Sequence, residues 1–198
     1  MEFGCRFAIY FAISALSFND YCVTHGLSDS LVNVAFGKPA RQSSNYSGRN
    51  HPLGKDGFTY TASLGVDGNN STNFDSDSCS HTDKDNMGPP WWEVDLKDPY
   101  LIKKINIFQI NDTRFLTCNY ESEIRGKLEN DEYMSLGSFK ELYNRIVTIN
   151  ITTTYKFKTI RIEYTSNKTD AFICLCEVEV FAGKTTNAAR LYNLHLMT

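Results

Sequence analysis

The sequence lacks the features of several large functional classes. Its 20 lysine and arginine residues are outnumbered by 23 aspartate and glutamate residues, which gives a net charge of −3. Because nucleic-acid-binding domains carry a strong local excess of basic residues, this composition argues against nucleic acid as a partner. The GxSxG, HExxH and P-loop motifs are also absent. None of the 4 histidines has an evident nucleophile partner in the sequence, so we expect no enzymatic activity.

Long apolar runs are missing beyond the N-terminus. Residues 7–18 are almost wholly apolar and follow Arg6. This run is shorter than the roughly 20 residues of a membrane-spanning helix and is typical of the apolar region of a signal peptide. Glu2 nearly cancels the charge of Arg6, which leaves a buried N-terminal element as the alternative. We expect residues 1–24 to be a signal peptide, no transmembrane segment to follow, and the mature protein to be secreted and extracellular.

Cysteines and glycosylation motifs agree with secretion. The chain has 6 cysteines, and disulfides form mainly in secreted proteins. Cys5 lies in the predicted leader, and the role of Cys22 stays open. The other four allow three pairings and are Cys79, Cys118, Cys174 and Cys176. The motif N-x-S/T, an acceptor for N-glycosylation, begins at Asn45, Asn69, Asn70, Asn111, Asn150 and Asn167.

The body of the chain has the pattern of an all-β domain. Its 13 phenylalanines and 11 tyrosines favour strands. In residues 156–164, Ile160 and Ile162 alternate with Thr159 and Arg161, as in a half-buried strand. Similar runs occupy residues 91–96, 104–110, 145–151 and 173–181. In the last run, alternation predicts one shared face for Cys174, Cys176, Val178 and Val180.

The strands and loops predict one domain over residues 31–183, followed by a polar tail over residues 184–198. Short strands separated by loops rich in Gly, Asn, Asp and Ser are typical of a sandwich or a barrel. Residues 37–90 are rich in loop-forming residues. In binding proteins such loops usually carry the site, so we expect the ligand site there.

A series of short segments resembles a known family. The segments are NVAFGKPARQSS (residues 33–44), VDGN (66–69), SCSHT (78–82), PWWEVDL (90–96) and LCEVEVF (175–181). In this order they resemble the F-type lectins, the fucolectin and tachylectin-4 group, whose fold is related to discoidin domains. The resemblance covers residues 31–183. It implies an all-β jelly-roll β-sandwich of the galactose-binding-domain-like type, a loop site for fucose, a bound calcium ion and no catalysis.

The calcium site implied by the resemblance uses residues far apart in the chain. By itself, Asp67-Gly68-Asn69 is a turn signal, but Ca²⁺ also prefers hard oxygen ligands from such loops. The implied ligands are Leu64 (backbone carbonyl), Asp67, Asn69, Ser78, Cys176 (backbone carbonyl) and Glu177. The family often has Asn where this chain has Leu64, a change that a main-chain ligand tolerates. A glycan on Asn69 would remove that side chain as a ligand, and we expect Asn70 to be the acceptor.

The resemblance also implies a disulfide between Cys79 and Cys176. This bond would tie the calcium loop to the last strand. Closing a loop of this length adds about 4–5 kcal/mol to stability in the chain-entropy model. The remaining pair, Cys118 and Cys174, is expected to form a second bond. The alternative is two free or differently paired thiols.

The sugar site implied by the family is only partly present. His81 matches the histidine that binds sugar in the family, where an imidazole can hydrogen-bond a hydroxyl or ring oxygen. The two arginines of the family are not in register with this sequence. Arg114 is the basic residue in the matching loop, and we expect it to substitute, with Phe115 and Tyr120 as a stacking surface. Arg125 is another candidate, but we expect it to lie in the strand after the loop. The alternative for His81 is a purely structural role.

The sequence therefore predicts a secreted, calcium-stabilised, fucose-type carbohydrate-binding lectin domain that acts in innate recognition or adhesion. Its partners would be fucosylated glycans, and a homo-oligomer is expected by analogy because clustering raises avidity. The alternative is a degenerate member that no longer binds fucose and serves as a protein-interaction or structural module. Discoidin-type phospholipid binding is a further alternative that would require apolar side chains at the loop tips.

Overall fold

The computed structural model describes residues 30–48, 55–83, 88–115, 118–119, 121–139, 146–165 and 171–183. The predicted signal peptide and tail, together with Cys5, Cys22, Tyr120 and Asn167, lie outside these residues. In the part of the chain that is described, strands are joined by loops and short 3-10 helices. No helix in that part is long and apolar enough to cross a membrane.

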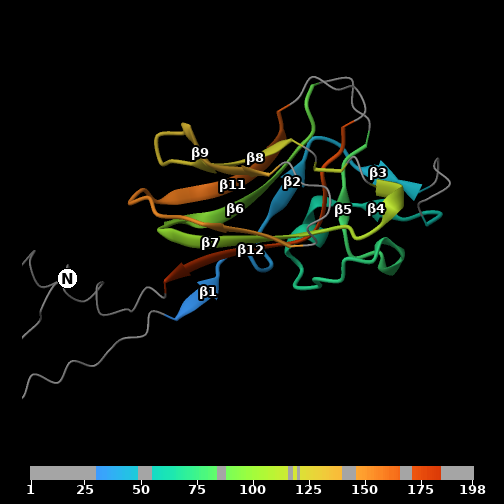
Figure 1. Cartoon of the computed structure of the whole chain (residues 1–198), viewed down its shortest axis with the longest axis horizontal. Coiled ribbons are helices and arrows are strands. Elements are labelled where there is room, and N and C mark those ends of the chain that lie inside the picture. The colour runs from blue at the N-terminus through green and yellow to red at the C-terminus, as the bar shows by residue number, and fades with distance from the viewer. Residues whose placement is uncertain are drawn as a thin grey trace, which may run out of the picture.

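Two antiparallel sheets pack face to face (Figure 1). The first has the order β1-β12-β7-β10, and β5 also pairs with β12. Its strands are β1 (Leu31–Asn33), β5 (Ser80–His81), β7 (Ile102–Gln109), β10 (Ile146–Asn150) and β12 (Cys174–Gly183). The second has the order β2-β6-β11-β8-β9. Its strands are β2 (Ala40–Gln42), β6 (Trp91–Tyr100), β8 (Ser122–Lys127), β9 (Tyr133–Phe139) and β11 (Phe157–Tyr164). The predicted all-β sandwich is confirmed.

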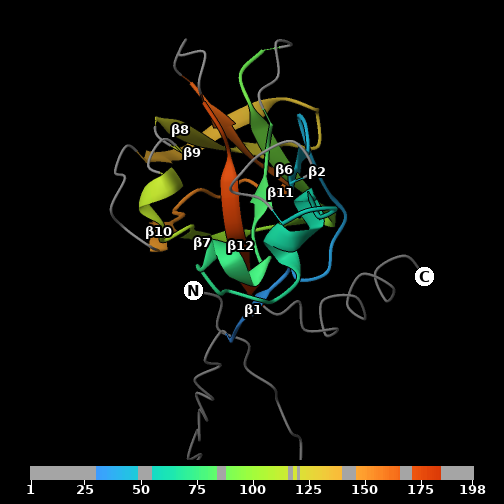
Figure 2. The same cartoon turned by 90° about the vertical axis from the view of Figure 1, so that its right-hand side faces the viewer.

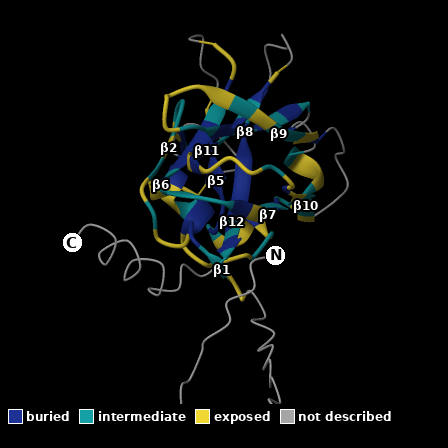
Figure 3. Ribbon diagram, turned by 90° about the vertical axis from the view of Figure 1, so that its left-hand side faces the viewer, coloured by how far each residue is buried: buried dark blue, intermediate teal, exposed yellow. Residues whose placement is uncertain are grey.

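The core lies between the two sheets because each sheet turns one apolar face inward. On β11, Ile160 and Ile162 are fully buried and pair in register with Val94 and Trp92 of β6. They pack with apolar residues of β7 and β12 from the opposite sheet. The indole nitrogen of Trp92 donates a hydrogen bond to the carbonyl of Ala62, at 2.9 Å, which satisfies this buried polar group. Figure 3 shows the buried residues gathered along the central strands, while exposed residues lie on the turns and on outer strands such as β9 and β10.

The predicted alternation along the last strand is wrong at the two cysteines. Leu175 joins Val178 in the core cluster, whereas Cys174 and Cys176 lie outside that cluster and form disulfides. The cause is a register shift of β12 against β7 between Leu175 and Glu177. Such a bulge inserts an extra residue and changes the face on which the following side chains point. As a result, Cys176 and Glu177 are consecutive residues that both contact the loops.

The hairpin of β8 and β9 was not predicted from the sequence. In β8, Ile124 is the single large apolar side chain, and the other buried positions are Ser122 and Gly126. Gly126 is required because the ring of Phe157 occupies the space beside it. A Cβ at Gly126 would lie 2.4 Å from Cδ1 of Phe157. The hydrophobic pattern of this strand is therefore too weak to identify it.

Gly126→Ala is expected to lower the free energy of unfolding by about 1–3 kcal/mol, the usual cost of overpacking a core. The measurement is urea unfolding followed by tryptophan fluorescence. Gly183→Ala is the matched control, because a Cβ there would meet no atom within 4 Å. Equal stability of the two variants would show that the Phe157 ring does not fix this position.

Candidate functional site

Short elements, most of them from the loop-rich residues 37–90, gather at one end of the sandwich (Figures 1 and 2). They are the two-stranded sheet of β3 (Tyr46–Ser47) and β4 (Thr59–Tyr60), the 3-10 helices η2 (Ala62–Val66), η3 (Phe74–Ser76) and η4 (Thr113–Phe115), and strand β5. We call this group the loop cluster. It contains both predicted sugar-binding residues, because His81 lies on β5 and Arg114 on η4.

Two disulfides anchor the loop cluster to β12. Cys79 is bonded to Cys176 and Cys118 to Cys174, which confirms both expected pairs. His81 lies opposite Cys174 in the β5–β12 ladder, and its Nε2 is 3.9 Å from Sγ of Cys118. Because zinc sites use cysteine thiolates and these sulfurs are in a disulfide, this group of His81 and two cysteines does not have the chemistry of a zinc site.

His81 is held among aromatic rings and is only 2% exposed. Its ring centroid lies 4.6 Å from that of Tyr46, 5.3 Å from that of Phe172 and 5.5 Å from that of Phe115. Its Nδ1 is 2.5 Å from the carbonyl oxygen of Thr82. These contacts fix the imidazole in place and leave little of it accessible to a ligand.

A second hydrophobic cluster lies beneath these loops. Tyr46, Tyr60 and Phe74 are buried in it, and Phe115 packs against them. The rings of Tyr60 and Phe74 stack with centroids 4.9 Å apart. Of these residues the sequence analysis identified Phe115 alone. The density of aromatic residues in an otherwise polar, loop-rich half of the chain was the signal that could have found the others.

Arg114 lies at the edge of the same cluster. Its Nε donates to Oδ2 of Asp112 at 2.8 Å, and its Nη2 donates to Oδ1 of Asp75 at 2.9 Å and also to Asp112. The hydrogen bond from Arg114 holds the pKa of Asp112 below its ordinary value. The guanidinium carbon is 5.8 Å from the ring centroid of Phe115. Arg114 and His81 therefore both lie close to the Phe115 ring, and Asp75 is a partner of Arg114 that the sequence did not reveal.

The predicted calcium loop packs beside β12. Oδ1 of Asp67 accepts a hydrogen bond from the backbone nitrogen of Asn69 at 2.8 Å. The Ser78 hydroxyl donates to the carbonyl of Ser71 at 2.7 Å. Gly68 N donates to Oε2 of Glu177 at 3.1 Å and so connects the loop to the strand. These hydrogen bonds fix the shape of the loop.

Glu177 is a buried acid with an unused acceptor. It is 1% exposed, and its Oε1 has no hydrogen-bond partner among the described residues. Burial, together with the neighbouring carboxylates of Asp67 and Glu179, raises the pKa of Glu177 to about 7. A buried carboxylate is costly to ionise unless a cation compensates its charge. Oε1 of Glu177, with the carboxylate of Asp67 nearby, is therefore suited to bind a divalent cation.

The six implied calcium ligands are brought together by the fold. Leu64, Asp67 and Asn69 lie on or directly after η2, which packs against β12. Ser78 precedes a cysteine whose partner is Cys176, and Glu177 is the next residue. Oxygen atoms of these types, with two carboxylates among them, match the preference of Ca²⁺.

A comparison with protein families decides the classification. Residues 64–166 match the family model of NedA-like, galactose-binding domains, and this range includes the calcium loop, His81 and Arg114. The chain belongs to that family. The range covers just over half of the chain.

Known proteins that are similar to this chain confirm its resemblance to the F-type lectins. Fucolectin-3 from Anguilla japonica is 37% identical over 101 residues, which are 51% of this chain and 50% of the relative. The chain thus matches about half the length of this curated relative. A fucose-binding module from Streptococcus pneumoniae, SpX-3, has a TM-score of 0.63 at 26% identity, over 77% of this chain and 99% of the module. An F-lectin from striped bass (Morone saxatilis) serum has a TM-score of 0.62 at 28% identity, over 77% of this chain and 49% of that protein.

Proposed function

We propose that this NedA-like domain is a carbohydrate-binding lectin whose ligand contacts the loop cluster. The observation that carries the proposal is that the His81 ring and the Arg114 guanidinium lie 5.5 Å and 5.8 Å, respectively, from the Phe115 ring centroid, at the end of the sandwich where the loops meet. An aromatic face and a guanidinium are suited to the apolar and hydroxyl surfaces of a sugar. The relatives are named as fucolectins and a fucose-binding module.

The ligand contacts in this chain differ from those implied by the family resemblance. His81 is buried, so the accessible groups at the rim are Arg114, Asp75 and Phe115. Arg114 is 36% exposed and Asp75 is 67% exposed in their side chains. A guanidinium has five donors, and a carboxylate accepts hydrogen bonds, so this pair can bind adjacent sugar hydroxyls. Fucosylated glycans are the proposed ligand class.

Calcium is proposed as the ion that stabilises this site. Asp67, Asn69 and Ser78 would supply side-chain oxygens, and Leu64 and Cys176 main-chain carbonyls. Glu177 would supply the buried carboxylate. When bound, the ion neutralises the adjacent carboxylates and fixes the loop, and it takes no part in a reaction. The same loop is joined to β12 by the Cys79–Cys176 bond.

Secretion and glycosylation also belong to the proposal. The five sequon asparagines within the described residues, Asn45, Asn69, Asn70, Asn111 and Asn150, are all exposed. Exposed sequons can accept glycans in a secreted protein, and the two disulfides suit an oxidising compartment. A role in innate recognition or adhesion and a homo-oligomeric state follow from the lectin assignment as proposals, as does the lack of enzymatic activity.

A protein-interaction or structural module is the second candidate. The observation that favours it is the burial of His81 among aromatic rings, which is the contact pattern of a structural histidine. Under this alternative the loop cluster keeps its shape but no longer binds fucose.

Binding to a glycan array tests the two candidates. The wild-type protein is expected to bind fucosylated glycans. Arg114→Ala should weaken binding about tenfold or more, because it removes charge-assisted hydrogen bonds to the ligand. Arg125→Ala is the matched control. Arg125 is 38% exposed and likewise pairs with two carboxylates, Glu123 and Glu163, but lies on β8, outside the loop cluster.

The outcomes of this experiment are distinct. Loss of binding in Arg114→Ala with retention in Arg125→Ala supports a lectin that uses the loop cluster. Absence of binding by the wild-type protein to any glycan on the array would reject the lectin proposal and favour the interaction module.

A further inference from the structure

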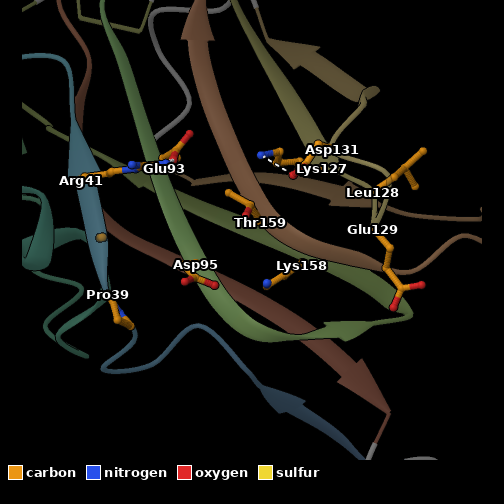
Figure 4. Close-up of a pocket in the computed structure, with 11 residues that line it drawn as sticks. Pro39, Arg41, Glu93, Asp95, Lys127, Leu128, Glu129, Asp131, Lys158 and Thr159 are labelled. Carbon is orange, nitrogen blue, oxygen red and sulfur yellow. Dashed lines mark hydrogen bonds and ion pairs between the residues drawn. The ribbon is translucent and has the colours of Figure 1, made fainter.

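An open cavity of about 460 Å³ lies on the outer face of the second sheet (Figure 4). Its floor includes Thr159 of β11 and Asp95 of β6. Its walls are β2 on one side and the turn between β8 and β9 on the other, and Pro39 and Leu128 are among the lining residues of these two sides. None of its lining residues belongs to the loop cluster. Its volume lies within the range of about 300–1,000 Å³ that is typical of small-molecule sites.

The sheet is curved at this cavity. The hydroxyl of Tyr133 on β9 donates to Oε2 of Glu93 on β6 at 3.2 Å, although β11 and β8 lie between these strands. On a flat sheet three strand spacings would separate the two backbones by about 14 Å, so the sheet must curl to bring the side chains together. The guanidinium of Arg161 also lies 4.2 Å from the ring of Trp91 and 5.9 Å from that of Tyr133. The outer face is therefore a concave surface with fixed side chains.

Glu93 holds this surface together. It is 3% exposed and accepts hydrogen bonds from Nε of Arg41 at 2.6 Å and Nη1 of Arg161 at 3.0 Å, besides that from Tyr133. Burial acts to raise its pKa, but the hydrogen bonds from Arg41 and Arg161 hold the pKa below the ordinary value for glutamate. Protein donors occupy both carboxylate oxygens of Glu93, so this residue fixes the side chains around it and does not bind a ligand itself. Contacts to a ligand would come from the other polar residues that line the groove.

The other charged residues that line the groove include both positive and negative side chains. Their donors are Arg41, Lys127 and Lys158, and their acceptors are Asp95, Glu129 and Asp131. Lys127 and Asp131 form an ion pair of 2.7 Å, drawn as the dashed line in Figure 4. Lys158 is exposed and forms no ion pair within the described part of the chain. With Glu93 included, the lining has three positive and four negative residues, and Arg161 also binds Glu93 from beside the groove, so neither sign of charge dominates.

We propose that this groove binds a neutral sugar unit and is a second glycan site, separate from the loop cluster. Each sugar hydroxyl both donates and accepts hydrogen bonds, which matches alternating ammonium, guanidinium and carboxylate groups. Pro39 and Leu128 offer apolar contacts to the C–H groups of the ring. Two sites on one domain raise the avidity for a branched or multivalent glycan. The proposal does not depend on sugar binding by the loop cluster.

Two-dimensional ¹H–¹⁵N spectra of the full chain test the proposal. The probes are galactose and lactose as neutral sugars, glucuronate as an anion and glucosamine as a cation. The neutral sugars should give saturable shifts at the amides of residues 40–41, 127–131 and 158–159. Lys158→Ala should weaken this binding about three- to tenfold, as expected for the loss of one hydrogen bond. Lys103→Ala is the control, because this exposed lysine makes the same charge change on β7 of the other sheet.

The same titration of Arg114→Ala separates this proposal from the function of the loop cluster. Groove shifts that persist in Arg114→Ala support a separate site, whether or not the loop cluster binds glycans. The proposal is overturned if no neutral sugar gives saturable shifts at the groove, if Lys158→Ala binds as the wild-type protein does, or if glucuronate or glucosamine binds there more tightly than galactose and lactose.

Discussion

Addition of a calcium chelator is expected to lower the melting temperature of the protein by about 5–10 °C relative to a sample saturated with calcium. An ion present at about 100 times its Kd stabilises the folded state by about 2.7 kcal/mol, and each kcal/mol shifts the melting temperature by about 2–4 °C in a domain of this size. The structural basis is Glu177, whose buried Oε1 has no hydrogen-bond partner among the described residues and lies near a second acid, Asp67. Differential scanning calorimetry with chelator and with added Ca²⁺ measures the shift.

Glu177→Gln tests whether this carboxylate carries the effect. The amide has nearly the volume of the acid and its oxygen can still accept the hydrogen bond from Gly68, so the fold should persist. Its melting temperature should not respond to calcium. Glu179→Gln is the control, since it makes the same change two residues along β12, where the side chain accepts a hydrogen bond from Asn106. A wild-type melting temperature that is the same with chelator and with calcium would contradict the proposed site.

The second large effect is expected from the disulfide that joins the calcium loop to β12. Removing it in the double variant Cys79→Ala/Cys176→Ala should lower the free energy of unfolding by about 2–5 kcal/mol, the usual cost of losing a native disulfide in a small domain. The two cysteines are 97 residues apart in sequence and both are buried, so the bond restricts a long loop of the unfolded chain. Urea unfolding of the variant and of the wild-type protein measures the loss of stability. The same measurement with and without Ca²⁺ shows whether the variant has also lost its stabilisation by calcium.

The other disulfide serves as the comparison. Cys118→Ala/Cys174→Ala opens a shorter loop, with a sequence separation of 56 residues, and leaves the connection of the calcium loop intact. This variant should be destabilised but should keep its stabilisation by calcium, while glycan binding weakens because Cys118 lies beside His81. If both double variants lost the calcium response equally, the specific link between Cys79–Cys176 and the ion would be rejected.

Much of the architecture follows from local patterns in the sequence. The run from Phe157 to Tyr164 alternates so clearly that its buried face could be named before the structure was known, and the same holds for the apolar residues of β6. Strand pairing then requires burial of these faces against each other. The strand β8 was missed because its outward residues are charged and its inward ones include serine and glycine, and β9 was missed because serine and glycine interrupt its apolar residues.

The details of the site depend on contacts between distant segments, which local patterns do not contain. Arg114 pairs with Asp75, 39 residues away, and this contact exists only because η3 and η4 meet under the aromatic rings. The bulge at Cys176 similarly depends on the pairing of β12 with β7. The sequence motif identified His81 but could not show that aromatic rings from several loops bury it.

The groove on the second sheet was missed for a related reason. Charged residues alternate along the strands of its floor, as Glu93 and Asp95 do on the outward face of β6, and such patterns usually indicate a solvated surface. The hydrogen bond between Tyr133 and Glu93 reveals that this surface is concave. Curvature is a property of the whole sheet and does not follow from any one strand.

The most direct test of the lectin assignment is a ¹H–¹⁵N titration of the full chain with a fucosylated oligosaccharide in the presence of Ca²⁺. The assignment predicts saturable shifts concentrated in the loop cluster, at the amides of residues 74–76, 80–82 and 112–115, and the loss of these shifts in Arg114→Ala. Absence of saturable shifts in these segments, with the protein folded and calcium bound, would contradict it.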